Sequence, residues 1–241
     1  MQFEAKPLPA GIELDAEAGI LRGVSPPAGS YPVRVRAMNR HGTNETTFTI
    51  VSGSVLALTP PMGWNHWYTH YDRVTDGVIR RAAELMVSSG MADHGYEYVS
   101  IDDCWMRGPP EDELARLREE ALARKLAKFS PRRPRDPSRI GPTRDAKGRW
   151  LPNRWFPDMR ALTDYIHSFG LKAGIYTSPG PLTCAGYAGS YGHEATDVQT
   201  FVEWGFDLLK YDWCTYGAWV PGEGIERFQR PYRQVGELLA G

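Results

Sequence analysis

Three times along this chain, an amphipathic helix pattern ends at a glycine and a short apolar strand pattern follows. The glycines are Gly90, Gly170 and Gly205, and the strand patterns occupy residues 96–101, residues 171–175 and the segment leading to Asp212. Glycine ends a helix at low steric cost because it tolerates the left-handed conformation. Alternating helices and strands favour a parallel sheet, and α/β proteins place their sites where such strands end. The sequence therefore predicts an α/β fold with functional residues at the strand ends.

The last of these strands ends in two charges, Lys210 and Asp212. Side chains alternate faces along a strand, so both are expected to point the same way. A mostly buried pair of opposite charges is costly unless it is satisfied, and such pairs often mark chemistry. On these residues alone, a strand-end salt bridge and a functional site are equally acceptable interpretations.

The overall composition is that of an ordinary globular protein. The chain has 241 residues, of which 41% are hydrophobic and 24% charged, and its net charge is −1. This charge gives no electrostatic reason to expect nucleic acid as a partner. No apolar run approaches the ~20 residues of a membrane helix, and no signal peptide is visible at the N-terminus. Eight Trp and twelve Tyr suit a sugar-binding cleft, although most are expected in the core.

Residues 1–53 are expected to form a small all-β module. Apolar residues alternate with arginines over residues 31–37, and a second alternating stretch covers residues 46–51. Shorter strands are expected at residues 12–14 and 20–24. These segments and their turns resemble the immunoglobulin-like modules attached to bacterial surface and secreted enzymes. Four strands are fewer than the ~7 of a complete sandwich, so the module is expected to be partial.

Residues 54–241 follow the βα pattern, which begins near Leu56 and contains an insertion at about 107–150. Within it, i,i+4 charge pairs and a modest apolar stripe predict one exposed helix. Arg132, Arg133 and Arg135 lie among prolines. A basic tether for a partner is conceivable there, but a solvated loop is favoured.

Polar and aromatic residues gather at the predicted strand ends. They are Trp64, Asn65, Asp102, Asp103, Tyr176, Lys210 and Asp212. Carboxylates accept hydrogen bonds from hydroxyls, lysine donates them, and tryptophan can cover the apolar face of a sugar ring. A carboxylate close to an anomeric carbon can act as a nucleophile. The set therefore suits a polyhydroxylated ligand.

Five segments of the chain resemble glycoside hydrolase family 27, the α-galactosidase (melibiase) and α-N-acetylgalactosaminidase family. They are PPMGWN at 60–65, YEYVSIDDCW at 96–105, GLKAGIY at 170–176, TCAG at 183–186 and LKYDWC at 209–214. The resemblance covers about residues 56–240 in the family's order. It implies a (β/α)8 TIM barrel, of which this chain would hold the first four βα units, preceded by the immunoglobulin-like segment.

The resemblance also implies roles for individual residues. Asp212 matches the nucleophile of a retaining mechanism, and Lys210 matches a lysine that bonds the sugar and helps keep the nucleophile ionised. Asp102 and Asp103 match the acidic pair that binds sugar hydroxyls. The pocket-lining aromatics of the family are matched by Tyr176 and Trp64. Asp158 and Asp164 are also acidic, but they fall on a predicted helix and are interpreted as surface or capping groups.

Three cysteines leave at least one unpaired. Cys184 and Cys214 both follow predicted strand ends, so they could meet. A zinc site that adds His193 is an alternative, although no CxxC spacing supports it. The resemblance implies a Cys184–Cys214 disulfide beside the site. It leaves Cys104 as a free, buried thiol, because residues 66–73 contain no cysteine where many relatives have its partner.

We expect the parent protein to be a retaining glycoside hydrolase acting on terminal α-galactosyl residues. In the family the acid/base aspartate lies downstream of the position matched by Gly241, so the isolated chain is expected to show no meaningful turnover. The alternative is a non-catalytic carbohydrate-binding or degenerate module. A galactoside is the expected partner, with no nucleic acid, membrane, metal or organic cofactor. The expected disulfide and the surface-type module suggest an extracellular or periplasmic location.

Overall fold

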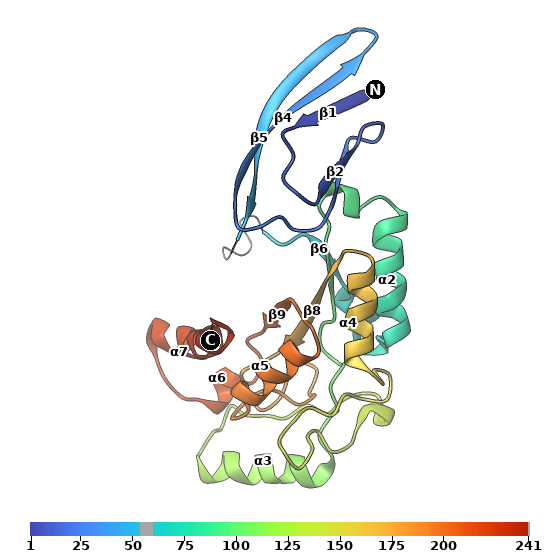
Figure 1. Ribbon diagram of the computed structural model, residues 1–241. Helices are drawn as coiled ribbons and strands as arrows, with labels where there is room; N and C mark the ends of the chain where they lie inside the picture. The colour runs from blue at the N-terminus through green and yellow to red at the C-terminus, as the bar shows by residue number, and fades with distance from the viewer. Residues whose placement is uncertain (54–59, 241) are drawn as a thin grey trace. The chain divides into compact units, whose positions relative to one another are not determined.

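The computed structural model describes residues 1–53 and 60–240, and the chain divides into two compact units (Figure 1). The first unit is Met1–Pro61 and the second is Met62–Gly241. The expected boundary at residue 54 and the change of pattern near Leu56 lie outside the described residues. Each unit is described by itself.

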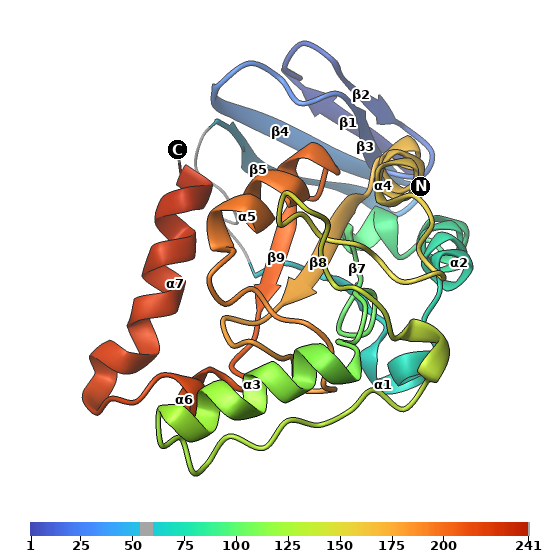
Figure 2. The same ribbon diagram turned by 90° about the horizontal axis from the view of Figure 1, so that it is seen from below.

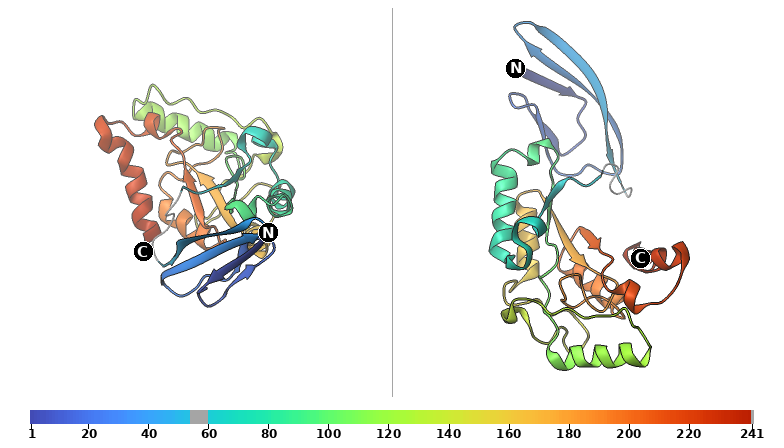
Figure 3. Two further views of the ribbon diagram at one scale, coloured as in Figure 1. Left: turned by 90° about the horizontal axis from the view of Figure 1, so that it is seen from above. Right: turned by 180° about the vertical axis from the view of Figure 1, so that it is seen from behind.

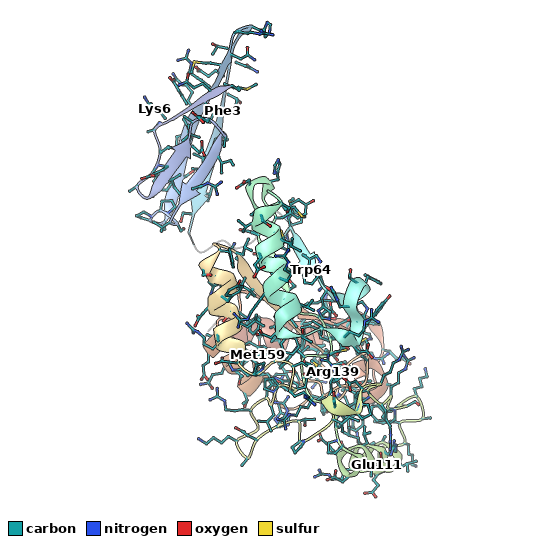
Figure 4. The ribbon with its side chains drawn as sticks, turned by 90° about the vertical axis from the view of Figure 1, so that its right-hand side faces the viewer. Phe3, Lys6, Trp64, Glu111, Arg139 and Met159 are labelled. Carbon is teal, nitrogen blue, oxygen red and sulfur yellow. A yellow bond between two sulfur atoms is a disulfide. The ribbon has the colours of Figure 1, made fainter. Side chains whose placement is uncertain are left out.

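The N-terminal unit is built from antiparallel strands. They are β1 (Gln2–Lys6), β2 (Ile12–Asp15), β3 (Ile20–Gly23), β4 (Gly29–Asn39) and β5 (Gly42–Ser52). The order β1-β4-β5 makes one sheet, and β2 pairs with β3 in a second. The long β4–β5 hairpin is plain from two sides in Figure 3. Strand β1, which carries Phe3 and Lys6 in Figure 4, was not among the four expected strands.

Alternation along β4 divides its side chains between two environments. Val33 is fully buried and Val35 is half-buried, whereas Arg34 and Arg36, on the other face of the strand, are exposed. Arg34 and Arg36 approach Glu45 on the neighbouring strand within 3.4 Å. Such exposed pairs contribute little to stability, so the burial of apolar side chains such as Val33 does more to hold this unit together.

The second unit contains a four-stranded parallel sheet in chain order (Figure 2). Its strands are β6 (Gly63–Asn65), β7 (Tyr98–Ser100), β8 (Lys172–Thr177) and β9 (Leu208–Tyr211). All three pairings are parallel. This confirms the predicted parallel sheet; the strands among the described residues form an open sheet, so a closed barrel is not seen in this part of the chain.

Helices connect and follow these strands. They are α1 (Trp67–His70), α2 (Asp76–Ser88), α3 (Glu111–Ala123), α4 (Met159–Ser168), α5 (Glu194–Glu203), α6 (Tyr216–Trp219) and α7 (Gly224–Ala240), with short 3₁₀ segments η1 (Tyr71–Arg73), η2 (Ala92–His94) and η3 (Pro137–Arg139). Helices α2 and α4 lie side by side in Figures 1 and 2. No helix in the described part of the chain is long and apolar enough to cross a membrane.

The start of α4 shows how the sequence sets a helix boundary. The helix begins at Met159 (Figure 4), two residues after Pro157, because Asp158 is the N-cap. Its carboxylate accepts the Ala161 N–H at 2.9 Å, which satisfies one of the unpaired donors of the first turn. The capping role predicted for Asp158 is therefore confirmed, and Asp164 pairs with Arg160 on the surface.

The main core lies between the sheet and helices α2 and α4. Fully or almost fully buried members include Ile79 and Ala83 from α2, Val99 from β7, Leu162 and Ile166 from α4, and Ala173 and Ile175 from β8. Each large aliphatic side chain buried in this way contributes about 1.5–3 kcal/mol to folding. The core fixes the strand order and so determines which residues meet at the strand ends.

The insertion differs from the expected exposed helix. One face of α3 is buried, because Leu114 and Ala121 form a second apolar cluster with Phe129, Leu182 and Trp219. The last two residues belong to the loop after β8 and to α6, which follows β9. The carboxyl end of β8 points toward α3 (Figures 2 and 3). The insertion therefore packs against the segments that follow the strand ends.

The buried Arg139 and the partly buried Arg144 attach the rest of the insertion to the second unit. Arg139, labelled in Figure 4, is 2% exposed and donates to the carbonyls of Cys104 and Val74 at 2.8 and 2.6 Å. Arg144 forms a two-point ion pair with Asp197 of α5, with N–O distances of 2.5 and 2.8 Å. The sequence showed only solvated arginines in this region, and Arg132, Arg133 and Arg135 are indeed exposed.

Candidate active site

The strand order brings most of the expected polar residues to one edge of the sheet. Asp102 and Asp103 follow β7 after one intervening residue, Tyr176 lies near the end of β8, and Lys210 and Asp212 lie at the end of β9 and just after it. Since these three strands are neighbours and parallel, their carboxyl ends meet. The resulting cluster contains three carboxylates and one lysine.

Asp102 is the most connected member of the cluster. It is 2% exposed, and its Oδ2 accepts from Lys210 Nζ at 2.6 Å and from Asn65 Nδ2 at 2.7 Å. The ion pair of Lys210 is therefore with Asp102, two strands away, rather than with Asp212 on its own strand. Lys210 Nζ also lies 5.2 Å from the centre of the Tyr176 ring. Alternation along one strand could not reveal this partner.

Asp103 is held by main-chain donors. Its carboxylate accepts the N–H of Cys104 at 2.7 Å and that of Ala185, in the loop after β8, at 2.9 Å. The pKa of Asp103 is raised to about 6, mainly by burial and, in the same direction, by the negative charge of Asp102. The hydrogen bonds from Ala185, Thr183 and Cys104 oppose this increase. Part of the Asp103 population is therefore protonated in mildly acidic solution.

This pKa predicts a pH-dependent effect of Asp103→Asn on stability. From about pH 4 to 6 the folded state binds more protons at Asp103 than the unfolded state, whose pKa is near the ordinary value of 3.8, so the stability contributed by the carboxyl falls as pH rises. The free energy of unfolding of Asp103→Asn, taken relative to that of wild type, should therefore rise by on the order of 2 kcal/mol over this interval. Urea unfolding near pH 4 and pH 7 measures the change. Asp164→Asn, which is exposed, is the control, and a pH-independent difference for Asp103→Asn would contradict the prediction.

Asp212 lies where β9 leaves the sheet, with its N–H bonded to the Thr177 carbonyl at 2.9 Å. Its Oδ1 accepts the Trp213 N–H at 2.8 Å, and its Oδ2 accepts the Tyr176 hydroxyl at 3.3 Å. Burial, followed by the charges of Asp103, Asp212 and Asp102, raises the pKa of Tyr176 above its ordinary value. Tyr176 is therefore a neutral donor to this carboxylate.

The expected disulfide between Cys184 and Cys214 is present. Both sulfur atoms lie within 4.8 Å of an Asp212 carboxylate oxygen, and the Tyr176 hydroxyl is 3.1 Å from Cys214 Sγ. Because the two sulfurs are bonded to each other, they offer no thiolates for the zinc site considered with His193. Cys104 is a free, buried cysteine, as expected, and burial raises the pKa of its thiol.

Trp64 is not brought to the carboxylates. In β6 its side chain points away from that of Asn65, which reaches Asp102. Trp64 instead meets the His70 ring, at 6.0 Å between centres. It lines a cavity of about 720 Å³ with residues of α2, beside which it lies in Figure 4. The sequence placed Asn65 among the strand-end residues, but its neighbour His66, which is fully buried beside Asp102, was not recognised.

A parallel βα sheet with acidic and aromatic residues at its carboxyl edge places this unit among the α/β proteins with a strand-end site. More particularly, the chain belongs to the Melibiase_2 family, described as Alpha galactosidase A, whose model matches residues 59–129 and 136–239. A separate model for an Ig domain matches residues 2–53.

Curated relatives carry the same description. A probable alpha-galactosidase of Dictyostelium discoideum is 42% identical over 159 residues, which is 66% of this chain and 33% of the relative. Alpha-galactosidase 2 of Arabidopsis thaliana is 40% identical over 185 residues, which is 76% of this chain and 39% of the relative. The chain thus spans about a third to two fifths of the length of these relatives.

Solved structures agree with the sequence comparison. Alpha-galactosidase I from Mortierella vinacea matches 77% of this chain and 38% of its own, with 33% identity and a TM-score of 0.59. An alpha-galactosidase from Saccharomyces cerevisiae, solved with raffinose, matches 77% of this chain and 33% of its own, with 28% identity and a TM-score of 0.59. The described sheet and its connections therefore have the fold of this family.

Proposed function

We propose that the complete natural polypeptide is a retaining glycoside hydrolase that cleaves terminal α-galactosyl residues, with Asp212 as its nucleophile. The observation that carries the proposal is the position of Asp212 at the carboxyl end of β9, where Tyr176 and the disulfide surround its carboxylate. Membership of the family supports the substrate class. Because the chain spans only part of its relatives, the activity is proposed for the whole protein.

The proposed reaction has two steps. In the first, an Asp212 oxygen forms a bond to the anomeric carbon while the bond from that carbon to the leaving oxygen breaks, and an acid protonates the leaving oxygen. Oδ2 suits the attack because it accepts the long Tyr176 hydrogen bond, whereas Oδ1 accepts the shorter bond from Trp213. In the second step, the group that acted as the acid takes a proton from water, whose oxygen attacks the anomeric carbon and releases the Asp212 carboxylate. The acid/base is not assigned among the residues of this chain.

The other members of the cluster are proposed to hold the sugar. Asp102 and Asp103 would accept hydrogen bonds from hydroxyl groups, and Lys210, whose side chain is 46% exposed, would donate them. Tyr176, whose side chain is buried, would orient the nucleophile through its hydroxyl. For Trp64 to line the pocket, as the resemblance implies, its side chain would have to leave the α2 cavity, so we propose no sugar contact for it.

We further propose that β6–β9 with their helices are the first four βα units of a (β/α)8 barrel, comprising residues 54–241 with the insertion at 107–150. Residues 1–53 would form a separate immunoglobulin-like module. The parallel order of the sheet and the likeness to solved alpha-galactosidases support this division. The disulfide beside the site supports an extracellular or periplasmic location.

The test is hydrolysis of 4-nitrophenyl α-galactoside by the complete polypeptide, with the β-anomer and the α-glucoside as comparisons. We expect nitrophenol release from the α-galactoside alone, and NMR should show α-galactose as the first product, since the mechanism retains configuration. Binding of galactose without hydrolysis would indicate a non-catalytic sugar-binding protein and overturn the proposal.

Lys210→Met is expected to lower kcat/KM for this substrate by about 100-fold, because it removes a donor and leaves the buried Asp102 carboxylate without its cation. Lys172→Met is a closely matched control. Lys172 is 45% exposed, pairs with Glu97 at 3.2 Å and lies 5.2 Å from the centre of the Tyr98 ring, but at the other end of the sheet. Equal activity losses in the two variants would contradict the assigned role of Lys210.

A further inference from the structure

His66 is a fully buried residue in contact with the site. It follows Asn65, the last residue of β6, and precedes α1. Its Nδ1 lies 2.9 Å from the backbone nitrogen of Asp102, and its Nε2 lies 3.2 Å from the carbonyl oxygen of Tyr71. Both ring nitrogens therefore have main-chain partners.

These partners fix the protonation of the ring. A backbone N–H can only donate, so Nδ1 must be the unprotonated acceptor toward Asp102. A carbonyl can only accept, so Nε2 must carry the proton toward Tyr71. The two contacts together require a neutral imidazole with its hydrogen on Nε2.

The charges around the ring agree with this state. The pKa of His66 is lowered to about 4, mainly by burial and, in the same direction, by His70 and Arg139. The negative charge of Asp102 and the Tyr71 carbonyl act in the opposite direction. A protonated Nδ1 would place its hydrogen against the N–H of Asp102, so the neutral form is the one compatible with the contact.

The backbone N–H of Asp102, which donates to His66, lies where the chain leaves the sheet. The Ile101 N–H still bonds to the Gly174 carbonyl of β8 at 2.9 Å. The next N–H, that of Asp102, bonds to His66. Because Asp102 is 2% exposed, this donor would have no solvent partner if the imidazole were removed, and a buried unpaired N–H is destabilising.

The position of the Asp102 backbone determines the geometry of both acidic residues. The Asp102 carboxylate accepts from Asn65, from Lys210 and from the Asp103 N–H at 2.9 Å. Two adjacent residues thus hold Asp102. The Asn65 side chain donates to the Asp102 carboxylate, and the His66 side chain accepts the Asp102 backbone N–H. A shift of the Asp102 backbone would move the carboxylates that the proposed function assigns to sugar binding.

We infer that His66 is a positioning residue of this site, whose neutral imidazole holds the Asp102 backbone through Nδ1 and thereby sets the geometry of the acidic pair. The inference rests on the proposed function for its effect on hydrolysis, but the tautomer and the hydrogen bond can be tested without it. His66 itself is not expected to touch the substrate.

Two variants of the complete polypeptide separate positioning from general stability. In His66→Asn, the side-chain amide oxygen can take the place of Nδ1 and accept from Asp102, but the bond to Tyr71 is lost. In His66→Gln, the amide can take the place of Nε2 and donate to Tyr71, but the Asp102 N–H is left unpaired. Each variant keeps one of two hydrogen bonds, so the midpoints of thermal unfolding should fall by similar amounts.

Hydrolysis of the α-galactoside should distinguish the two variants. We expect His66→Gln to lose about tenfold or more of kcat/KM and His66→Asn to remain within about threefold of wild type, because a small misplacement of a binding group has a large effect on rate. Equal losses in both variants, or a larger loss in His66→Asn, would overturn the inference while leaving the proposed function intact.

Nitrogen-15 NMR of histidine-labelled protein gives a readout that does not depend on activity. We expect the His66 signals of a neutral ring with the hydrogen on Nε2 at about pH 6. A ring protonated on Nδ1, or a doubly protonated ring, would overturn the inference. If wild type does not hydrolyse the substrate, the proposed function fails, and the NMR result still decides whether His66 holds Asp102 as inferred.

Discussion

Replacing Asp212 with asparagine should lower kcat for α-galactoside hydrolysis on the order of 10⁴-fold or more, with the fold retained. The amide oxygen can still accept the Trp213 N–H that Oδ1 now accepts, so the local structure has a substitute for its shorter hydrogen bond. An amide, however, is too weak a nucleophile to form the glycosyl ester of the proposed first step. Steady-state kinetics of the complete polypeptide measure the loss.

Asp164→Asn is the matched control for this experiment. Asp164 lies on α4, is 54% exposed and pairs with Arg160 at 2.8 Å, so its substitution should leave activity near wild type. Circular dichroism and thermal unfolding should show both variants folded. Activity of Asp212→Asn within about tenfold of wild type would be too high for a lost nucleophile, so the assignment would be wrong.

A covalent intermediate gives an independent check on Asp212. If acid quenching traps the glycosyl ester during turnover, peptide mass analysis should find one added hexosyl group on the peptide that contains Asp212. The same group on a peptide from another part of the protein would move the nucleophile there.

Removing the disulfide with Cys184→Ser and Cys214→Ser should lower the free energy of unfolding by about 3–4 kcal/mol. The bond joins residues 30 positions apart, so without it the unfolded chain gains conformational freedom. Urea unfolding of wild type and the double variant measures the difference. A difference below about 1 kcal/mol would contradict the estimate.

Thiol counting tests the pairing itself. Under denaturing, non-reducing conditions the 241-residue chain should show one reactive thiol, that of Cys104, and after reduction it should show three. Cys104→Ser should show none before reduction and two after it. Three reactive thiols in unreduced wild type would overturn the pairing of Cys184 with Cys214.

The order of elements in the second unit could be predicted because each signal is local. Gly90, Gly170 and Gly205 all have positive φ angles, of 82°, 73° and 83°, and each follows a helix, where such a conformation favours glycine. Because a helix connects each short apolar strand to the next, parallel pairing of the strands is favoured. Strand β1 of the first unit lacks such a signal, since its partners in β4 lie about thirty residues away, as in the pair of Ala5 with Val35.

The members of the candidate site could be predicted better than their contacts. Residues that follow parallel strands gather at one edge whatever their partners are. Which side chain meets which depends on lateral strand order, so the bond from Lys210 to Asp102 was not visible in the pattern along β9. In the three-residue strand β6, the family resemblance implied that Trp64 lines the site. Neighbouring side chains of a strand point to opposite faces, and it is Asn65 whose side chain faces Asp102.

The second apolar cluster has a consequence for how the region around the strand ends becomes ordered. Trp219 is 1% exposed, its ring lies 4.6 Å from that of Phe129 in the insertion, and Arg124 at the end of α3 donates to its carbonyl oxygen at 2.8 Å. Leu182, in the loop that carries Cys184, is buried in the same cluster. The loop after β8, the segment after β9 and the insertion therefore form one cooperative unit, because none of them can bury its apolar side chains in this cluster until the other two are in place.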